Sequence, residues 1–192
     1  DDIFTVKPSN MEALFHKFQD RGVAIERRAT FFHHINCTNE RTLKWIDAFK
    51  PVSVQIGIES GDDRMLQNLG KTFRSDVAYD KLRLIHEHGH AVTALFLIGY
   101  PEESVDSLET TYRFMQRISH LVDKIWVSVF QPVPGTVGWR KAAERVGTIA
   151  NPKRNTDVTY VDPNLTAAIL VDYREKMMNI KTAHAAKNDR AV

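Results

Sequence analysis

The sequence predicts an α/β fold in which parallel strands alternate with helices. Three apolar runs, at 52–61, 94–102 and 127–136, each stop abruptly in Gly, Pro or polar residues, and helical stretches separate them. Such alternation is typical of a parallel sheet covered by helices, with ligands bound at the carboxyl ends of the strands. We therefore look for function at these three strand ends.

The first run has two different faces. One face is aliphatic and consists of Val52, Val54, Ile56 and Ile58. The other face is small or polar and consists of Ser53, Gln55, Gly57 and Glu59. A parallel strand buried on both sides would be apolar almost throughout. The polar face fits either the lumen of a barrel that holds a ligand or an edge strand exposed to water, and the small residues at its end favour the lumen.

Helix boundaries follow from capping residues beside apolar residues at helical spacing. Helix starts are indicated at Ser9 (with Glu12 as a capping box), Thr38 or Asn39, Ser75 and Ser104. Helix ends are indicated at Gly22, Pro51, Gly70 and Gly89. A short helix is expected around 65–69.

The remaining elements are read from composition. A strand carrying three charged residues is expected from Val23 to about Thr30, and the last strand from Ile125 to Phe130. A short helix should end near residue 145, and another should run from 165 to 180. The polar tail from Thr182 onward is expected to be a fraying helix or a linker.

The count of elements predicts a partial barrel or an open sheet. Four strands are each followed by a helix, and Asp1–Thr5 has the sequence of a strand end, so we expect the chain to begin inside a larger fold. A closed eightfold barrel typically needs about 250 residues, and this chain has 192. We expect a core over residues 1–147 and a helical extension with a polar tail over 148–192.

Composition excludes some classes of function. The formal charge is only +2 and the basic residues are scattered, which argues against nucleic acid as a partner. No apolar run is long enough to cross a bilayer. A single cysteine excludes an internal disulfide and favours a reducing compartment, so we expect a cytoplasmic protein without a membrane span.

Four motifs in order resemble the radical S-adenosylmethionine (SAM) superfamily, most closely the branch whose larger members carry a cobalamin-binding domain. The motifs are Asp1-Asp2-Ile3-Phe4-Thr5, Gly57-Ile58-Glu59-Ser60-Gly61 followed by Leu66 and Lys71, Phe96-Leu97-Ile98-Gly99-Tyr100-Pro101-Glu102-Glu103-Ser104, and Pro132-Val133-Pro134-Gly135-Thr136. The resemblance covers residues 1 to about 147. It implies a partial (β/α)6 TIM-like barrel with outer helices, here lacking its N-terminal strands.

The resemblance also implies an activity. A [4Fe–4S] cluster would reductively cleave SAM to start radical chemistry on a small-molecule substrate, with an electron donor such as flavodoxin or ferredoxin. Methyl transfer that depends on cobalamin is one subclass. No catalytic residue of this chain is implied.

Ten residues are implied to contact SAM: Asp2, Arg28, Gln55, Glu59, Ser60, Lys71, Leu97, Gly99, Glu102 and Gln131. Asp2 would lie near the methionine amine, Glu59 would accept hydrogen bonds from the ribose hydroxyls, and Lys71 would face the methionine carboxylate. The register of the strand expected from Val23 to about Thr30 leaves open whether Arg27 or Arg28 faces the barrel lumen.

The adenine end of SAM would lie at the next two strands. Leu97 would pack on adenine and Gly99 would admit it, with Glu102 completing the motif at the end of the 94–102 run. Gln131 would offer hydrogen bonds to adenine at the end of the strand expected from Ile125 to Phe130. Apart from the resemblance, Lys71 could be a solvated lysine and Glu102 could serve only the start of the next helix.

The chain departs from the family at the cluster. The family holds it with three cysteines in a C-x3-C-x2-C loop, and this sequence has only Cys37. Either the cluster loop lies outside these residues, or the chain is a degenerate barrel that binds a nucleotide-like ligand or a partner. An unrelated partial (β/α) enzyme is a third reading. We expect the chain alone to be inactive.

Other conspicuous residues have plain interpretations. His86 and His90 are four apart, but Gly89 interrupts the helix between them, so we expect no metal site. Cys37 is interpreted as an incidental thiol. The three tryptophans, Trp45, Trp126 and Trp139, are interpreted as packing residues.

Overall fold

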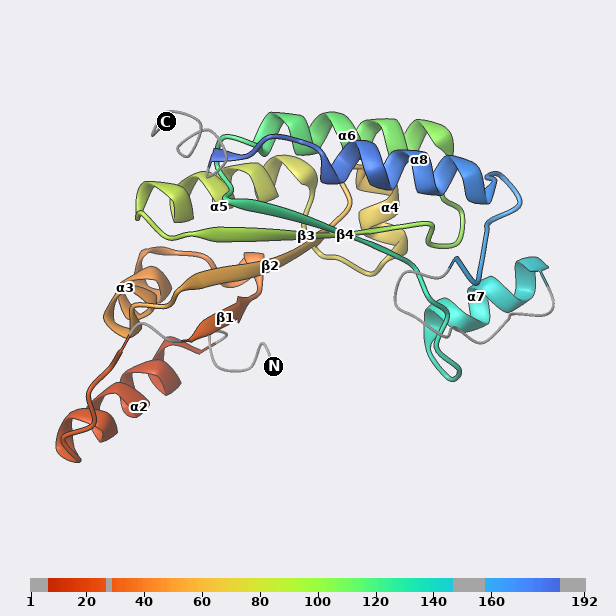
Figure 1. The fold of residues 1–192 in the computed structure, drawn as a ribbon. Helices are drawn as coiled ribbons and strands as arrows, with labels where there is room; N and C mark the ends of the chain where they lie inside the picture. Colours follow the sequence, from red (N-terminus) through yellow and green to blue (C-terminus); the bar gives the residue numbers. More distant parts are fainter. Residues whose placement is uncertain (1–6, 27–28, 147–157, 184–192) are drawn as a thin grey trace.

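The computed structural model describes residues 7–26, 29–146 and 158–183. Within these residues the chain forms one parallel sheet with strand order β1-β2-β3-β4. The strands are β1 (Thr30–His33), β2 (Ser53–Glu59), β3 (Val92–Ile98) and β4 (Lys124–Val129). Strands that neighbour one another in the sheet are consecutive in the chain, and helices connect them, as parallel pairing requires. The prediction of an α/β fold is confirmed (Figure 1).

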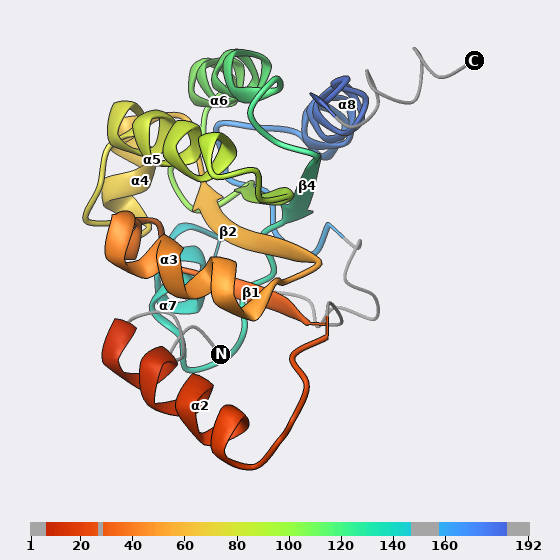
Figure 2. The same ribbon diagram turned by 90° about the vertical axis from the view of Figure 1, so that its left-hand side faces the viewer.

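Helices connect the strands and pack around this sheet (Figure 1). They are α2 (Pro8–Asp20), α3 (Glu40–Phe49), α4 (Asp63–Asn68), α5 (Ser75–Glu87), α6 (Val105–Ile118), α7 (Val137–Val146) and α8 (Ala167–Met178), with a 3-10 turn, η1 (Ile35–Cys37), after β1. Seen from the side, α3, α5, α6 and α8 follow the curved sheet as an outer arc, while α7 lies near the carboxyl ends of the strands (Figures 1 and 2). None of the described helices is long and apolar enough to cross a membrane.

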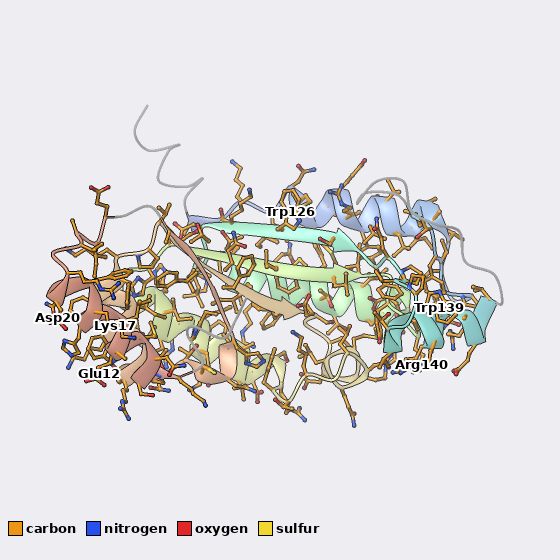
Figure 3. The ribbon with its side chains drawn as sticks, turned by 90° about the horizontal axis from the view of Figure 1, so that it is seen from below. Glu12, Lys17, Asp20, Trp126, Trp139 and Arg140 are labelled. Carbon is orange, nitrogen blue, oxygen red and sulfur yellow. The ribbon has the colours of Figure 1, made fainter. Side chains whose placement is uncertain are left out.

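The two faces of the sheet differ as the sequence predicts. In β2 the buried residues are Val54, Ile56 and Ile58, which join the main apolar core beneath the helices. The intervening residues remain partly exposed, and the sheet seen from below presents this second face (Figure 3). Val52 is an exception, because β2 begins at Ser53 and the Val52 side chain is 44% exposed.

Several predicted helix boundaries are confirmed by capping contacts. Asn39 accepts a hydrogen bond from Thr42 N at 3.1 Å, and Ser104 forms a reciprocal capping box with Ser107. Gly22, Gly70 and Gly89 follow helix ends with positive φ angles, where glycine is favoured.

Two predicted helix starts are wrong by one or two residues. The N-cap positions are Lys7 and Arg74 rather than Ser9 and Ser75, and neither side chain makes a capping hydrogen bond.

The strand predicted from Val23 to Thr30 is also wrong. The hydrogen bonds between β1 and β2 begin where Val52 N donates to Ala29 O at 2.7 Å, and β1 occupies Thr30–His33. The segment from Val23 to Glu26 is not part of the sheet. The strand end predicted at Asp1–Thr5 lies outside the described residues.

The C-terminal extension packs against the core. Leu170, Tyr173 and Met177 of α8 belong to the main core cluster. Two further side chains of α8 hydrogen-bond to the outer edge of β4: Arg174 Nε donates to Val127 O at 3.2 Å, and Met178 Sδ accepts from Val127 N at 3.3 Å. α8 therefore protects the edge of the sheet.

Residues 184–192 of the expected polar tail lie outside the described residues, and the first residue of that tail is Thr182. Its hydroxyl donates to Asp123 O at 2.7 Å, and Ala183 N donates to Ser119 O at 3.0 Å. These two residues are anchored beside the start of β4, because their backbone and hydroxyl groups find partners there.

Candidate functional site

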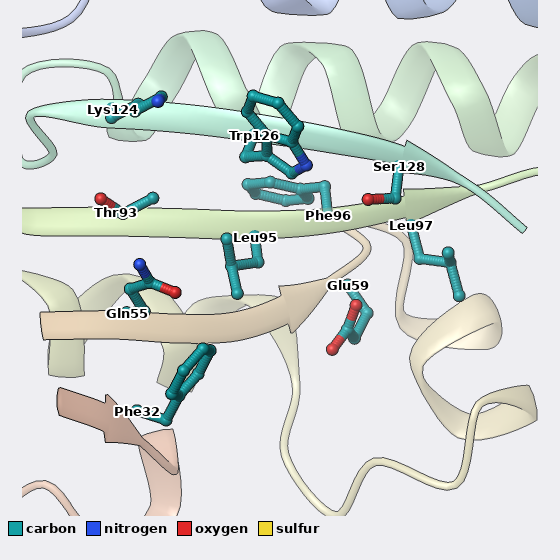
Figure 4. A pocket seen from close by; sticks show the side chains of 10 residues that line it. All are labelled: Phe32, Gln55, Glu59, Thr93, Leu95, Phe96, Leu97, Lys124, Trp126 and Ser128. Atoms are coloured by element: carbon teal, nitrogen blue, oxygen red, sulfur yellow. The ribbon is translucent and has the colours of Figure 1, made fainter. Parts of the chain in front are cut away.

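A pocket of about 560 Å3 lies on the open face of the sheet. Its lining residues come from all four strands: Phe32, Gln55, Glu59, Thr93, Leu95, Phe96, Leu97, Lys124, Trp126 and Ser128 (Figure 4). The volume falls within the range of small-molecule sites. The prediction that the polar face of β2 borders a ligand-sized space is supported by this pocket.

The strand register arranges the lining in rows across the sheet. Gln55, Thr93 and Lys124 form a polar row near the start of the strands, and Gly57, Leu95 and Trp126 form an apolar row above it. Toward the carboxyl ends, Leu97 is paired with Ser128, and Glu59 closes the end of β2. The pocket therefore changes character from one end of the strands to the other.

Glu59 has an unusual backbone conformation. Its φ angle is +74°, in the left-handed region, and the pairing of β2 with β3 shifts register between Gly57 and Glu59. A non-glycine residue in this region is strained, and such strain is often found at ligand sites. The carboxylate is 26% exposed and lines the pocket.

Lys71 contacts Glu59 in a smaller adjoining pocket of about 150 Å3. Lys71 Nζ lies 3.2 Å from Glu59 Oε1 and donates to Gly57 O, also at 3.2 Å. A lysine has three donors, so one remains for a ligand. Within the described part of the chain, Glu59 Oε2 makes no hydrogen bond, so one carboxylate oxygen also remains available.

Gly57 is needed beside this pair. A Cβ atom at Gly57 would lie 2.6 Å from Glu59 Oε1 and 3.8 Å from Lys71 Nζ. Any larger residue would displace the carboxylate, because 2.6 Å is shorter than real Cβ contacts. The Gly57, Glu59 and Lys71 constellation is thus a cradle with an anionic and a cationic group.

The structure brings together four of the residues predicted to contact SAM. Gln55, Glu59 and Leu97 line the larger pocket, and Lys71 lines the adjoining one with Gln55 and Glu59. Asp2 and Arg28 lie outside the described residues. The predicted contacts of all of these residues with SAM stay predictions.

Four other predicted residues lie away from the lining. Ser60 is buried behind the sheet, where its hydroxyl is 2.9 Å from that of Thr111 on α6. Gly99 has a φ angle of +79°, and a Cβ there would meet Leu170 at 3.2 Å, on the helical side. Glu102 is exposed in the turn after β3, and Gln131 follows β4.

The interpretation of Trp126 as a packing residue is wrong. Its side chain is 43% exposed and lies on the open face, well separated from Trp139 on α7 (Figure 3). Odd and even positions of β4 face opposite sides, and the even positions face the pocket. Sequence alternation in the Ile125–Val129 segment could have indicated this.

A buried ion pair at the strand ends was not predicted from the sequence. The Asp162 side chain is fully buried, and Arg145 of α7 contacts both its oxygens, with Nε–Oδ2 at 2.5 Å and Nη2–Oδ1 at 2.9 Å. The Tyr160 hydroxyl also donates to Oδ2, at 2.9 Å. Glu102 N donates to the same oxygen at 2.8 Å, so Asp162 fixes the turn after β3.

These contacts determine the charge of Asp162. Burial alone would raise the pKa of the Asp162 carboxyl, but hydrogen bonds from Arg145 and from the backbone N–H groups of Glu102 and Asn164 outweigh burial. The pKa of Asp162 is therefore lowered. Asp162 stays ionised and keeps α7 joined to the turn.

The pKa of a second buried carboxyl, Glu103, is shifted in the opposite direction. Burial raises its pKa to about 7, although hydrogen bonds from Ser107 Oγ and Gly99 N oppose this. Glu103 is 2% exposed, and its Oε2 lies 3.3 Å from Gly99 N. Deprotonation of Glu103 thus introduces a buried charge directly behind the end of β3.

Replacing Glu103 with Gln should therefore stabilise the protein at pH 8. The folded state binds a proton that the unfolded state releases between the ordinary pKa of 4.5 and about 7, so wild-type stability falls as pH rises through this window. The gain should reach about 3 kcal/mol at pH 8 and vanish near pH 4. Urea unfolding across this pH range measures it.

The control for this prediction is Glu102→Gln, because Glu102 is exposed in the same turn. Its unfolding free energy at pH 8 should stay close to that of wild type. A Glu103→Gln variant that gains nothing above pH 7 would contradict the buried, protonated carboxyl.

The residues present do not fit an iron–sulfur cluster. The sequence contains one cysteine, and the described residues contain no group of three His, Cys, Asp or Glu that could hold a metal ion. His90 Nε2 lies 2.7 Å from Asp47 Oδ1, and His88 contacts Glu40 at 3.1 Å. These histidines face carboxylates of α3.

Comparison with solved structures assigns the fold. The chain superposes on coproporphyrinogen III oxidase from Escherichia coli, a radical SAM enzyme, with a TM-score of 0.63 and 12% identity over 86% of this chain and 36% of that one. It superposes on the radical SAM methyltransferase TsrM from Kitasatospora setae, solved with cobalamin and a [4Fe–4S] cluster, with a TM-score of 0.60 and 13% identity over 91% and 36%. The chain has the partial barrel fold of these radical SAM enzymes, and the predicted resemblance is confirmed for the fold.

Comparison with curated sequences finds distant relatives. An uncharacterized methyltransferase from Pyrococcus horikoshii is 26% identical over 142 residues, 74% of this chain and 30% of the relative. An uncharacterized protein from Methanopyrus kandleri is 33% identical over 85 residues, 44% of this chain and 16% of the relative. No protein-family profile matches the chain. The chain spans about a third or less of the length of these relatives.

Proposed function

We propose that this chain forms the SAM-binding wall of a radical SAM enzyme, with Glu59 and Lys71 as its principal polar contacts. The observation that carries the proposal is the Gly57, Glu59 and Lys71 cradle, which opens onto a ligand-sized pocket at the end of β2. The fold shared with radical SAM enzymes supports it.

The cradle fits the chemistry of SAM. A carboxylate with an available oxygen can accept hydrogen bonds from a ribose diol, and a lysine with an available donor can hold a carboxylate. The Glu59–Lys71 contact would keep both groups in place before SAM binds. Leu97, two residues before Gly99, would offer an apolar surface to adenine.

SAM would be the source of the radical chemistry, and a [4Fe–4S] cluster would supply the electron for it. Because the residues of this chain do not fit a cluster, the cluster ligands would belong to other parts of the intact protein. The residues described here would bind and orient SAM, and the apolar wall of the pocket would exclude water.

Methyl transfer with cobalamin is the finer proposal. It rests on similarity to TsrM and to the methyltransferase from Pyrococcus horikoshii. A small-molecule substrate and a flavodoxin- or ferredoxin-like electron donor would be the partners.

Replacing Glu59 with Ala in the intact protein should weaken SAM binding by about 1–3 kcal/mol, because the ribose hydroxyls lose their acceptor. Lys71→Met should weaken binding of SAM more than binding of decarboxylated SAM, which lacks the methionine carboxylate. Isothermal titration calorimetry measures both affinities.

The matched control is Lys81→Met. Lys81 also donates to a backbone carbonyl, Thr38 O, at 2.8 Å, but it lies on α5 on the helical side of the sheet. Its affinity for SAM should equal that of wild type. If Lys71→Met lowers the affinities for SAM and for decarboxylated SAM equally, Lys71 is not part of the SAM site. If Glu59→Ala leaves SAM affinity unchanged, Glu59 is not part of it.

A further inference from the structure

Trp126 is a large aromatic residue of β4 that lies on the open face of the sheet. An indole is a large apolar group that normally gains stability from burial, yet Trp126 is 43% exposed and borders the open pocket. It lies in the middle of β4, below the strand ends that carry Glu59. An exposed aromatic ring in a pocket is a surface on which another flat group can pack.

The row that contains Trp126 forms an apolar slot. Leu95 is its direct neighbour on β3, and Gly57 follows on β2 without a side chain. Phe32 of β1, 47% exposed, is paired with Gln55 in the adjacent row and lines the same pocket from its far side (Figure 4). The slot is therefore bounded by two aromatic rings and an aliphatic residue.

A cation lies at the lower end of the slot. Lys124 is two residues before Trp126 on the same face of β4, and its Nζ is 5.2 Å from the centroid of the Trp126 ring system. Within the described ranges Lys124 makes no ion pair, whereas Lys71 at the upper end is paired with Glu59. Thr93 and Gln55 share the row of Lys124 and add polar groups.

We propose that this slot binds a substrate made of a flat apolar ring and an acidic group, with the ring against Trp126 and the acid at Lys124. The proposal rests on the proposed function, since it names the substrate class for the same pocket. A ring in the slot would lie directly below a nucleoside held at Glu59 and Leu97. A neutral ligand would leave Lys124 facing an apolar ring with no counter-charge.

The test uses the intact protein and three probes: 2-naphthoate, its neutral amide 2-naphthamide, and propanoate, which lacks the ring. Calorimetry should show that 2-naphthoate binds about tenfold more tightly than 2-naphthamide, the difference expected for one charge-assisted hydrogen bond. Propanoate should not bind at millimolar concentration. Trp126→Ala should weaken 2-naphthoate about fivefold or more, and Lys124→Met should abolish the preference for the acid over the amide.

The matched control is Lys44→Met. Lys44 lies 5.8 Å from the Trp45 ring, a similar cation–aromatic contact on α3, and its loss should leave 2-naphthoate binding unchanged. SAM affinity, measured separately, should be retained in Trp126→Ala and Lys124→Met.

The two proposals can fail independently. If 2-naphthoate binds in a manner that depends on Trp126 while SAM does not bind, the slot stands and the proposed function fails. If SAM binds but 2-naphthoate does not, side chains from the rest of the intact protein fill the slot and this inference is overturned. Equal binding of the acid and the amide would overturn the role of Lys124.

Discussion

Replacing Asp162 with Ala should destabilise the protein by about 3 kcal/mol, a large part of the stability of a typical domain. The substitution removes the acceptor for Arg145, for the Tyr160 hydroxyl and for Glu102 N. The Asp162 side chain that accepts all three hydrogen bonds is fully buried. The loss arises because desolvated donors remain without a partner.

Asp162→Asn separates charge from hydrogen bonding. The lowered pKa of Asp162 means that its stabilising effect is present above the ordinary carboxylate pKa and is lost as pH falls through the lowered value. The difference between wild type and Asp162→Asn should therefore be largest near neutral pH and shrink in acid. Urea unfolding at several pH values measures it.

The control for both variants is Asp172→Ala. Asp172 pairs with Lys176 at 2.7 Å, but both side chains are more than half exposed, and solvent weakens such pairs. Its unfolding free energy should stay close to wild type. A loss of less than about 1 kcal/mol for Asp162→Ala would contradict the clamp between α7 and the turn after β3.

Gly61→Ala should also be strongly destabilising, by about 2–3 kcal/mol. A Cβ at Gly61 would lie 2.3 Å from Phe114 Cβ and 3.0 Å from Thr111 Cα. Neither atom can rotate away, because both are fixed to the backbone of α6. The helix must shift, and the hydrogen bond from Gly61 N to Thr111 Oγ1, now 3.1 Å, would be strained.

A double-mutant cycle tests this reason. Phe114→Ala removes the ring but keeps the clashing Cβ, so it should not rescue Gly61→Ala, and the two losses should at least add. If removing the Phe114 ring restores stability to Gly61→Ala, the ring rather than the helix backbone sets the close approach.

Local signals predicted the parts of the fold that local chemistry decides. Ser104 and the pair Thr38 or Asn39 could be named as helix starts, because such side chains satisfy backbone N–H groups within the same turn; the structure selects Asn39 of the pair. The faces of β2 followed from the alternation of its side chains.

Contacts between distant residues were not predictable in this way. β1 was misplaced because the apolar residues after Gly22 indicate extended chain, whereas the register with Ser53 decides which residues pair. Asp162 is isolated in a segment without periodicity, and its partners Arg145 and Glu102 lie 17 and 60 positions away.

Only part of the candidate site could be predicted, because its contacts also join residues that are distant in the sequence. Glu59 and Lys71 could be named from their motif, but their mutual contact depends on how α4 returns the chain to the end of β2. Ser60 belongs to the same motif, yet the strand alternation turns it toward α6.

The measurement that tests the central claim most directly is SAM cleavage by the intact protein. The protein would be prepared anaerobically, reconstituted with iron and sulfide, and incubated with SAM and dithionite. We predict 5′-deoxyadenosine, or S-adenosylhomocysteine if a methyl group is transferred, with a strong reduction in Glu59→Ala and none in Lys81→Met. Absence of cluster absorbance and of both products from the intact protein would contradict the account and leave a barrel that only binds a ligand.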